Sequence, residues 1–323
     1  MKAIVQDSYG SSDVLRLHDI DRPVAGDNQL LVRVHAAGVD RGVLHLMTGL
    51  PYLLRAFGYG VRAPKVPVRG REVAGRVEAV GAKVTSFQPG DEVYGICEGS
   101  FAEYATVRED RAAPKPASLS LDQAAALPIS GVTALHAVRD AGQVKPGQTV
   151  LIIGAAGGVG TLAVQLAKAY GAEVTGVCST TKLDLVRSIG ADHVIDYTRE
   201  EIGDGDRRYD VILDTAGNRP LSQLRRALTP RGTLVIVGGE EGGRWLGGIQ
   251  RSLSAAMLSP FVRHTLRGLM PDEGSADLRV LGEYADAGTL TPVVDRTYPL
   301  SETAKAIRYL EEGHARGKVV ITV

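Results

Sequence analysis

The chain has 323 residues, 44% of them hydrophobic and 23% charged, which suits a globular protein of about two domains. Its 37 basic residues balance 37 acidic ones, and no basic stripe with interleaved aromatic residues occurs, so nucleic acid is not an expected partner. Two cysteines are too few for a disulfide framework, and neither a signal-peptide core nor an apolar run of about 18 residues is found, so we expect a cytoplasmic protein with no membrane partner.

The first 120 or so residues read mainly as short β-strands. These segments are rich in β-branched residues and are bounded by Gly, Pro or Asp, as in LLVRVHAAGV, VAGRVEAVG and AEYATV. A helical period occurs only near 43–54. Several short strands separated by turns predict an antiparallel barrel or sandwich.

From Leu121 onward, strands and helices alternate. A helical stretch interrupted at Pro128 leads to the strand TVLIIG, the helix VGTLAVQLAKAYG, the strand EVTGVCS and the helix TKLDLVRSIG. The strands HVIDY, VILDTAG and GTLVIVGG follow, with the helix PLSQLRRAL before the last. This rhythm predicts a parallel sheet covered by helices on both faces. Helical stretches at about 250–269 and 275–287, the helix SETAKAIRYLEEG and the strand GKVVITV complete the chain.

A glycine triplet joins the first strand of this alternating part to its first helix. Gly154, Gly157 and Gly160 follow one another at three-residue spacing. A sharp turn, a close approach of the backbone to a pyrophosphate and tight helix–strand packing all favour glycine there. The strand before, the helix after and the second strand beyond supply the context that a lone triplet lacks. We therefore predict a dinucleotide site at the helix N-terminus, with a tight turn that binds no ligand as the alternative.

The end of the second strand of this part predicts which dinucleotide binds. NAD sites usually have Asp or Glu there, which binds the ribose 2′-hydroxyl. Here Ser179, Thr180 and Lys182 follow instead, and hydroxyls with a cation suit a 2′-phosphate. We therefore expect NADPH, with a solvated Lys182 at a helix start as the alternative.

Further motifs extend this pattern over most of the chain, in the order AAGVD, GREVAGRVEAVG, FQPGDEVYG, FAEYATV, AAALPISGVTALHAV, VLIIGAAGGVGTLAVQLAKAYGAEV, SIGADHVIDY and GHARGKVVITV. Together they resemble the medium-chain dehydrogenase/reductase superfamily, and within it the zinc-free quinone oxidoreductases. The ending YLEEGHARGKVVI resembles the reticulon-interacting oxidoreductase branch and its bacterial relatives.

The resemblance implies an α/β architecture. A GroES-like β-barrel catalytic domain would comprise 1–122 and 290–323, and a Rossmann NADP-binding domain with a doubly wound parallel sheet would be inserted at 123–289. The active site would lie in the cleft between the domains. Many zinc-free relatives are dimers whose Rossmann sheets join edge to edge, so a homodimer is expected.

The resemblance also implies the residues that contact the cofactor. They are Thr133, Ala156, Gly157, Gly158, Val159, Ser179, Thr180, Lys182, Tyr197, Ala216, Gly217, Val237, Gly238, Gly239, Arg316 and Lys318. For Arg316 and Lys318, in the C-terminal tail, a solvated basic turn is the alternative.

The segments in which zinc-dependent members keep their metal ligands lack those ligands here. AAGVDRGVLH contains no Cys, and Arg71 stands where a Gly-His-Glu motif would supply His. A guanidinium is a permanent cation and cannot act as a ligand, whereas catalytic zinc generally needs three protein ligands. Cys97 and Cys178 are interpreted as structural thiols, so no metal is expected.

Without a metal, acceptors that delocalise negative charge are favoured, namely quinones and α,β-unsaturated carbonyls. We therefore predict an NADPH-dependent oxidoreductase for such small molecules. Tyr52 is the candidate proton donor, with Tyr59 or a packing role for Tyr52 as alternatives. Asp40 is a second candidate, because it stands where many zinc-free relatives have Asn, and Arg41 beside it could offset its charge.

Two other functions stay open at this point. The residues Arg55, Arg62, Lys65 and Arg69 could form a basic entrance for a 2-enoyl thioester, which would make the chain a 2-enoyl thioester or 2-alkenal reductase. A non-catalytic NADPH-binding sensor or interaction protein is the alternative from a different class.

Overall fold

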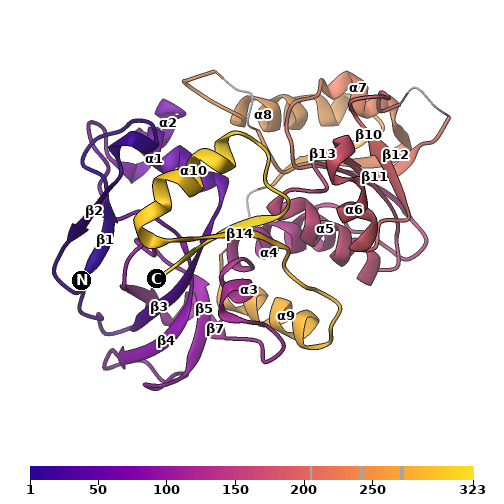
Figure 1. Ribbon diagram of the computed structural model, residues 1–323. Helices are drawn as coiled ribbons and strands as arrows, with labels where there is room; N and C mark the ends of the chain where they lie inside the picture. The colour runs from indigo at the N-terminus through magenta and orange to yellow at the C-terminus, as the bar shows by residue number, and fades with distance from the viewer. Residues whose placement is uncertain (204–205, 240–242, 270–272) are drawn as a thin grey trace. The chain divides into compact units, whose positions relative to one another are not determined.

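The structure, a computed structural model, describes residues 1–203, 206–239, 243–269 and 273–323 (Figure 1). The chain divides into two compact units. The first comprises residues 1–132 together with the segment from 272 to 323, and the second comprises 133–271. The second unit is therefore inserted into the first along the sequence.

The first unit is built on a mostly antiparallel sheet with the order β14-β15-β3-β4-β5-β7, in which β6 also pairs with β3. Only β14 and β15 pair in parallel, and β1 and β2 form a separate hairpin-like sheet. The strands are β1 (Lys2–Val5), β2 (Arg16–Asp19), β3 (Gln29–Val39), β4 (Glu72–Val80), β5 (Glu92–Ile96), β6 (Tyr104–Arg108), β7 (Ala112–Pro114), β14 (Val294–Pro299) and β15 (Lys318–Thr322).

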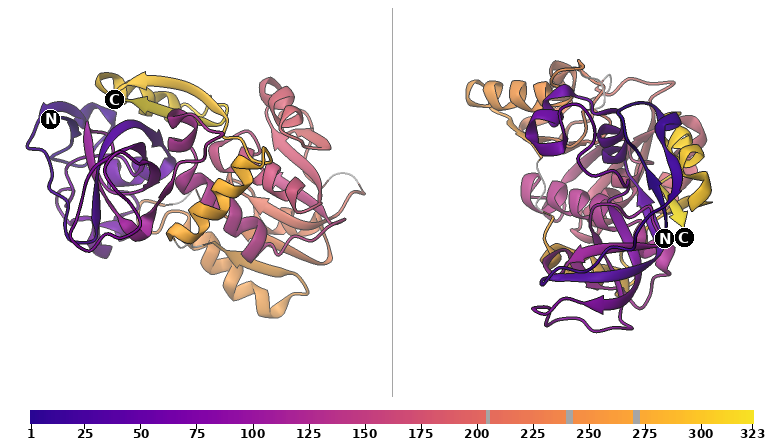
Figure 2. Two further views of the ribbon diagram at one scale, coloured as in Figure 1. Left: turned by 90° about the horizontal axis from the view of Figure 1, so that it is seen from below. Right: turned by 90° about the vertical axis from the view of Figure 1, so that its left-hand side faces the viewer.

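The sequence forms these strands because apolar side chains alternate with polar ones. In β3, Val32 and Val34 are buried, while Arg33 and His35 between and after them are exposed, which is the period of two of a half-covered strand. The last strand, β15, pairs antiparallel with β3, so the C-terminal tail completes the sheet that the N-terminal part began. The two chain ends lie near each other in all three views of Figures 1 and 2.

The first unit also contains several helices. They are α1 (Arg41–Thr48), α2 (Tyr52–Leu54), α3 (Leu121–Ala125), α9 (Ser275–Asp286) and α10 (Thr303–Glu311), with the short turns η1 (Ser12–Val14), η2 (Arg55–Tyr59), η3 (Glu109–Arg111) and η7 (Leu300–Glu302). Helix α3 contacts β3 and β4, and α9 contacts β7. Through these contacts the first unit includes residues 123–132 and 273–289, and the domain boundaries expected at 122/123 and 289/290 stay a prediction.

The second unit is an open parallel sheet with the order β10-β9-β8-β11-β12-β13. Its strands are β8 (Thr149–Ile153), β9 (Glu173–Cys178), β10 (His193–Asp196), β11 (Tyr209–Asp214), β12 (Leu228–Ile236) and β13 (Thr265–Gly268). Its helices are α5 (Gly158–Ala169), α6 (Leu183–Ser188), α7 (Leu221–Arg226) and α8 (Ile249–Leu258), with η4 (His136–Ala141), η5 (Thr180–Lys182) and η6 (Ser259–Phe261). Helix α4 (Pro128–Leu135) spans the division between the units along the sequence.

The strand order reverses between β8 and β11. The chain runs outward from β8 through α5, β9 and α6 to β10, and then outward in the other direction from β11 to β13. Right-handed crossovers place the helices of the two halves on opposite faces of such a sheet. Ligands bind at the carboxyl ends of the strands beside such a reversal, which here means the segments after β8 and β11.

One expected helix is partly wrong. The stretch 250–269 was expected to be helical, but only Ile249–Leu258 forms α8, and Thr265–Gly268 forms strand β13. Strand β13 pairs in parallel with β12, with Thr233 opposite Thr265 and Ile236 opposite Gly268. A short apolar run does not reveal its period, so its pairing with a distant strand decides the outcome.

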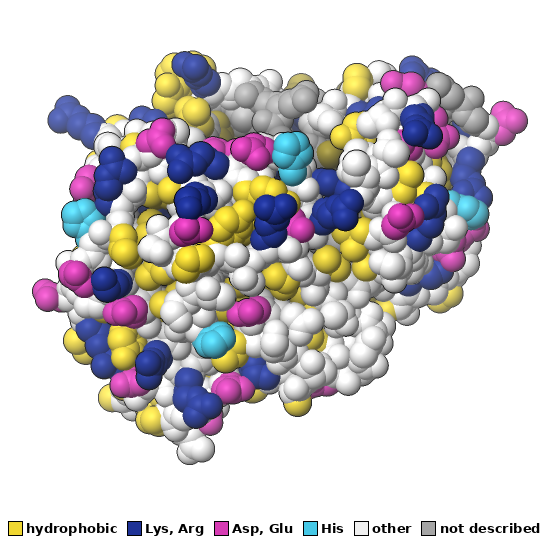
Figure 3. Space-filling model, in the orientation of Figure 1, with side chains coloured by type: hydrophobic (Ala, Val, Ile, Leu, Met, Phe, Trp, Pro, Cys, Tyr) yellow, Lys and Arg dark blue, Asp and Glu magenta, His cyan; other side chains and the backbone are white. Residues whose placement is uncertain are grey.

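On the face shown in Figure 3, basic and acidic side chains are interspersed rather than gathered into a large region of one sign. No helix among the described residues combines the length and the apolar character that crossing a membrane requires.

Candidate functional site

The predicted glycine loop lies where β8 ends and α5 begins. Gly154 adopts a φ of 80°, and a side chain there would meet the Thr215 hydroxyl, its Cβ lying 2.5 Å from Oγ1. A Cβ at Gly160 would collide with the carbonyl of Gly154, so the first turn of α5 packs directly on the loop. Helix α5 has Gly157 as its N-cap and no side chain bonded to its first N–H groups. Such open amides at a helix N-terminus fit a pyrophosphate.

The segment after β11 lines the loop on its other side. The Thr215 hydroxyl donates to the carbonyl of Ile153 at 2.7 Å, which ties the end of β11 to the end of β8. Gly217, with a φ of 72°, donates its N–H to Asp214 Oδ1 at 2.9 Å. A Cβ at Gly217 would lie 2.6 Å from the carbonyl oxygen of Gly238, so the ends of β11 and β12 approach each other.

A buried ion pair that the sequence did not reveal supports this segment. Asp214 is fully buried, and its Oδ2 accepts a hydrogen bond from Arg251 Nη2 at 2.8 Å. The same nitrogen donates to the carbonyl of Arg219 at 2.6 Å. Asp214 thus fixes both the Gly217 turn and helix α8, although the two residues of the pair are 37 positions apart and no short-range pattern joins them.

The end of β9 carries the residues expected to face a 2′-phosphate. Ser179 is the N-cap of the turn η5 that follows the strand, Thr180 and Lys182 lie on that turn, and Thr180 is exposed. Tyr197 is half-exposed and follows β10, and its N–H donates to the carbonyl of Cys178 at 3.2 Å. The structure thus brings these candidates together. It also adds Asp196, buried at the end of β10, whose carboxylate accepts a hydrogen bond from the Thr180 hydroxyl.

Other cofactor candidates of the second unit follow the ends of β8 and β12, and Thr133 lies on a helix. Ala156 is buried in the loop after β8, and Val237 follows β12 with its N–H bonded to the carbonyl of Asp214 at 3.0 Å. Thr133 lies on α4 and is partly buried. The geometry therefore groups most of the expected contacts around the carboxyl ends of β8, β9, β11 and β12.

Asp40 has a structural role that its sequence position did not indicate. It is the N-cap of α1, and its Oδ1 accepts a hydrogen bond from the N–H of Val43 at 3.3 Å. Its Oδ2 is buried and has no hydrogen-bond partner. Capping explains why a short polar side chain stands at this position, and the expected catalytic role of Asp40 stays a prediction.

Arg71 faces a carboxylate rather than a metal. Its Nη2 lies 2.7 and 2.8 Å from the two carboxylate oxygens of Glu273, and Arg111 approaches the same group at 3.3 Å. Burial alone would lower the pKa of Arg71, but the negative charges of Glu273 and Asp40 raise that pKa above its usual value. The guanidinium therefore stays charged and has no lone pair to offer a cation.

Glu72 and Lys318 form a fully buried pair beside Arg71 in sequence. Lys318 Nζ donates to Glu72 Oε2 and, at 3.2 Å, to the Ser130 hydroxyl, while Glu72 Oε1 accepts from the Ile129 N–H at 2.8 Å. Burial raises the pKa of Glu72, and the Lys318 ammonium opposes that effect. In the structure Lys318 is thus paired with Glu72 inside the first unit, and its expected cofactor contact stays a prediction. Arg316 is exposed, and its backbone N–H donates to Asp295 at 3.0 Å.

Tyr52 begins α2 and is partly exposed. The guanidinium of Arg55 lies 4.8 Å from the centroid of its ring and 4.2 Å from that of Tyr9. Tyr59, the alternative proton donor, lies at the end of η2 and is partly exposed. Tyr52 therefore stays a candidate proton donor, and its role stays a prediction.

Both cysteines are buried and unpaired, as expected. Burial raises the pKa of the Cys97 thiol to about 12 and that of the Cys178 thiol to about 11. Within the parts of the chain that the structure describes, no group of three or more His, Cys, Asp or Glu residues could hold a metal ion.

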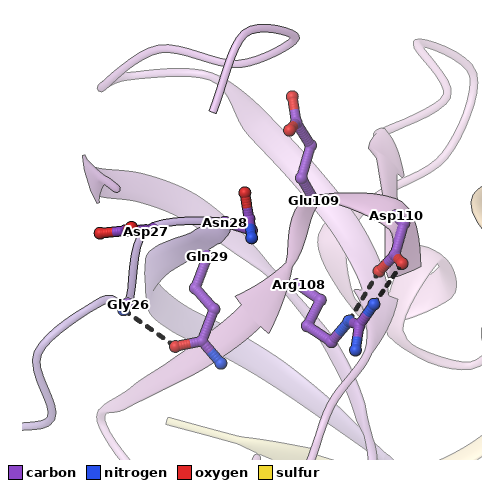
Figure 4. Close-up of a pocket in the computed structure, with 7 residues that line it drawn as sticks. All are labelled: Gly26, Asp27, Asn28, Gln29, Arg108, Glu109 and Asp110. Carbon is purple, nitrogen blue, oxygen red and sulfur yellow. Dashed lines mark hydrogen bonds and ion pairs between the residues drawn. The ribbon is translucent and has the colours of Figure 1, made fainter. Parts of the chain in front are cut away.

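A small polar pocket lies elsewhere in the first unit, between the turn before β3 and the turn after β6 (Figure 4). Its side chains are already paired: Arg108 with Asp110, and the Gln29 amide oxygen with the N–H of Gly26. Glu109 accepts hydrogen bonds from the N–H groups of Thr85 and Ser86. These hydrogen bonds stabilise the two turns that line the pocket, so we assign the pocket a structural role.

Comparisons with known proteins agree with this architecture. Residues 26–117 match the alcohol dehydrogenase GroES-like domain, and residues 189–321 match the family described as zinc-binding dehydrogenase. The chain is 33% identical to the mitochondrial NAD(P)H oxidoreductase RTN4IP1 of Mus musculus, over 100% of this chain and 89% of that protein. It is 37% identical to the chloroplastic NADPH-dependent alkenal/one oxidoreductase of Arabidopsis thaliana, over 99% and 79%.

Among solved structures, the quinone oxidoreductase from Coxiella burnetii superimposes with a TM-score of 0.87 at 30% identity, covering 100% of this chain and 99% of that one. The chain therefore belongs to the medium-chain dehydrogenase/reductase superfamily of oxidoreductases, in its quinone oxidoreductase group. This confirms the resemblance seen in the sequence, and with it a GroES-like domain and a Rossmann-like parallel sheet.

Proposed function

We propose that this chain is a metal-independent reductase that uses NADPH to reduce quinones or α,β-unsaturated carbonyl compounds. The observation that carries the proposal is the glycine-lined loop at the reversal point of the parallel sheet, where Gly154 and Gly160 let the first turn of α5 meet the end of β8. Relatives named for quinone and for alkenal/one reduction support this class of acceptor.

The chain's own residues would divide the binding of the cofactor among them. The open amides at the start of α5 would hold the pyrophosphate, and Ser179 and Lys182 would attract a 2′-phosphate. The segments at Ala216–Gly217 and Val237–Gly239 would orient the nicotinamide end. When bound, the reduced nicotinamide supplies the hydride.

The absence of zinc ligands at the expected positions supports the choice of acceptor. A plain ketone needs its oxygen polarised, whereas a quinone or enone spreads the developing charge over a hydroquinone anion or an enolate. Arg71 is fixed by Glu273, and its permanent charge makes a metal at this place unfavourable.

Tyr52 is the proposed proton donor, and a pair of variants tests it. Tyr52→Phe should lower kcat by roughly 10²-fold, within the range of general acid catalysis, because the ring stays and only the hydroxyl is lost. Asp40→Ser should keep kcat within about threefold, because Ser is an equally good N-cap. Steady-state kinetics and thermal unfolding of both proteins give the answer; normal turnover by Tyr52→Phe would show that the proton comes from elsewhere.

The deciding assay for the function is NADPH oxidation with a panel of ortho- and para-quinones, 2-alkenals and enoyl thioesters, with and without a chelator. Turnover of quinones or alkenals that is insensitive to the chelator is expected. Failure of every acceptor would overturn the proposal, and tight NADPH binding without turnover would favour a sensor or interaction role.

The enoyl-thioester alternative loses its main support. Two of the four residues of the expected basic entrance bind the C-terminal end of helix α1 instead. Arg69 is buried and donates to the carbonyl of Leu46. Arg55 donates to the carbonyls of Thr48 and Gly49. Cations at a helix C-terminus bind its open carbonyls and complement its dipole. Only Arg62 and Lys65 of the four remain exposed.

We also propose that the protein is a homodimer in the cytoplasm. Strand β13 is an end strand of the parallel sheet, and its outer edge pairs with no described strand. Unpaired, unreactive thiols suit a reducing compartment. No nucleic acid or membrane partner is proposed.

A further inference from the structure

The ends of β9 and β10 form a cluster that the glycine-loop pattern does not include. The two strands are parallel neighbours with Cys178 opposite Asp196, so the segments that follow them lie side by side. Asp196 is 5% exposed, whereas Thr180 and Thr198 on either side of it are exposed. An acidic residue therefore lies beside the end of β9, although it belongs to the neighbouring strand β10.

The carboxylate of Asp196 accepts the hydroxyl protons of both threonines. Thr180 Oγ1 donates to Oδ2 at 2.5 Å, and Thr198 Oγ1 donates to Oδ1 at 2.7 Å. The N–H of Thr198 also donates to Oδ1 at 3.0 Å, and the two hydroxyl oxygens lie 3.1 Å apart. The Nε of Arg199 lies 3.6 Å from Oδ2, and the Arg199 side chain is itself exposed.

A hydroxyl group has one proton to donate and two lone pairs. Because the proton of Thr180 points to Asp196, the outer side of Thr180 offers lone pairs. A 2′-phosphate carries only acceptor oxygens at neutral pH when fully ionised, so it gains nothing from such a group and is repelled by the carboxylate. A ribose 2′-hydroxyl can donate to the same lone pairs.

We propose that Asp196 is a specificity-determining residue: by binding the proton of Thr180 it limits the preference for NADPH and allows NADH to bind as well. This rests on the proposed nicotinamide-dependent function. Lys182 attracts the phosphate, and the Asp196–Thr180 pair opposes it, so cofactor choice is a balance between the two.

Asp196→Asn tests the balance with little change in shape. The amide keeps one oxygen for the N–H of Thr198, and its NH₂ group can donate to the oxygen of Thr180, which turns the Thr180 proton outward. The binding of NADPH and NADH, and of adenosine 2′,5′-bisphosphate and 5′-AMP, is measured by calorimetry. The affinity ratio of phosphorylated to unphosphorylated ligand should rise roughly tenfold or more, which corresponds to about 1.4 kcal/mol.

The matched control is Asp192→Asn, which removes the same charge at the opposite end of β10, where Asp192 pairs with Lys168. This control should leave the ratio unchanged. An unchanged ratio in Asp196→Asn as well would overturn the inference while leaving the proposed function intact. If the unaltered protein binds neither cofactor, the proposed function fails, and this inference fails with it.

Thr180→Val gives an independent test should Asp196→Asn fold poorly. If Thr180 offers only lone pairs, its loss weakens NADH binding severalfold and leaves NADPH binding nearly unchanged. A severalfold loss of NADPH affinity would instead show that Thr180 donates to the phosphate, which overturns the proposal.

Discussion

At the scale of single residues, Arg71 stands where zinc-dependent members of the superfamily have a His ligand, and it forms an ion pair with Glu273. The side chains of Arg71 and Glu273 are only 21% and 20% exposed, and both carboxylate oxygens lie within hydrogen-bond distance of Nη2. Charged groups that are this far from water interact more strongly than exposed ones. Arg71 is thus interpreted as an anchor for the segment that carries Glu273.

A double-mutant cycle measures this anchor. Arg71→Met and Glu273→Gln should each lower the free energy of unfolding, and the coupling between them should be about 1–2 kcal/mol by urea unfolding. The exposed pair Arg108–Asp110 is the control and should couple far more weakly. Because Glu273 neutralises Arg71, Arg71→Met should change KM for anionic and neutral quinones equally; a selective loss for anionic acceptors would assign it to substrate recognition.

The thiols yield a pH prediction. Raised pKa values of about 12 for Cys97 and about 11 for Cys178 leave almost no thiolate near pH 8. Iodoacetamide at that pH should therefore leave the native protein unmodified and alkylate both residues after unfolding, as read by mass spectrometry. Rapid labelling of the native protein would contradict the burial of both groups.

The raised pKa values of the two thiols also determine how the stability of the fold changes with pH. Unfolded cysteines lose their protons near pH 8.5. The folded state resists this loss, so its stability should fall as the pH rises from about 8.5 towards the folded pKa values near 11 and 12.

At the scale of elements, helix α8 leaves an apolar stripe uncovered next to the edge strand β13, which it contacts. The exposed apolar residues recur every four positions along the helix and the turns on either side of it. They are Trp245, Ile249, Leu253, Met257 and Phe261. Exposed apolar side chains beside an open sheet edge are where we expect the proposed homodimer to form.

Met257→Glu should therefore convert a dimer into monomers of 34.2 kDa in sedimentation experiments, because a charge would be buried in the interface. Ser254→Glu adds the same charge to an exposed position one residue off the stripe, and it should leave the dimer intact. Dissociation by both variants, or by neither, would contradict an interface along this stripe.

Elements also show how far sequence patterns reach. The strands β3 and β4 and the helices α5 and α10 were expected from their periodicity, and β8 was expected as a short apolar run between a turn and the glycine loop. Strand β13 was missed, since an edge strand of four residues is defined by its partner β12 rather than by its own pattern. The Asp214–Arg251 and Glu72–Lys318 pairs were missed for the same reason.

At the scale of the whole molecule, binding of the cofactor should stabilise the fold and removal of metal should not. NADPH at 100 times its Kd adds about 2.7 kcal/mol to the free energy of unfolding. For a folding unit of about 150–250 residues, this gain in free energy corresponds to a rise in Tm of roughly 5–10 °C. Scanning calorimetry with NADPH, and separately with a chelator, tests both statements; a Tm lowered by the chelator would reveal a structural metal.

The sequence alone determined the superfamily, the alternation of strands and helices, the glycine loop and the missing zinc ligands. These depend on residue type, short spacing and period, which neighbours along the chain can satisfy. Only the tertiary structure decided that Arg71 binds Glu273, that Lys318 is buried against Glu72, and that Asp40 caps α1. It also placed Asp196 beside Thr180. Those contacts are set by strand order and packing, since charges far apart in sequence meet only once the sheets are assembled.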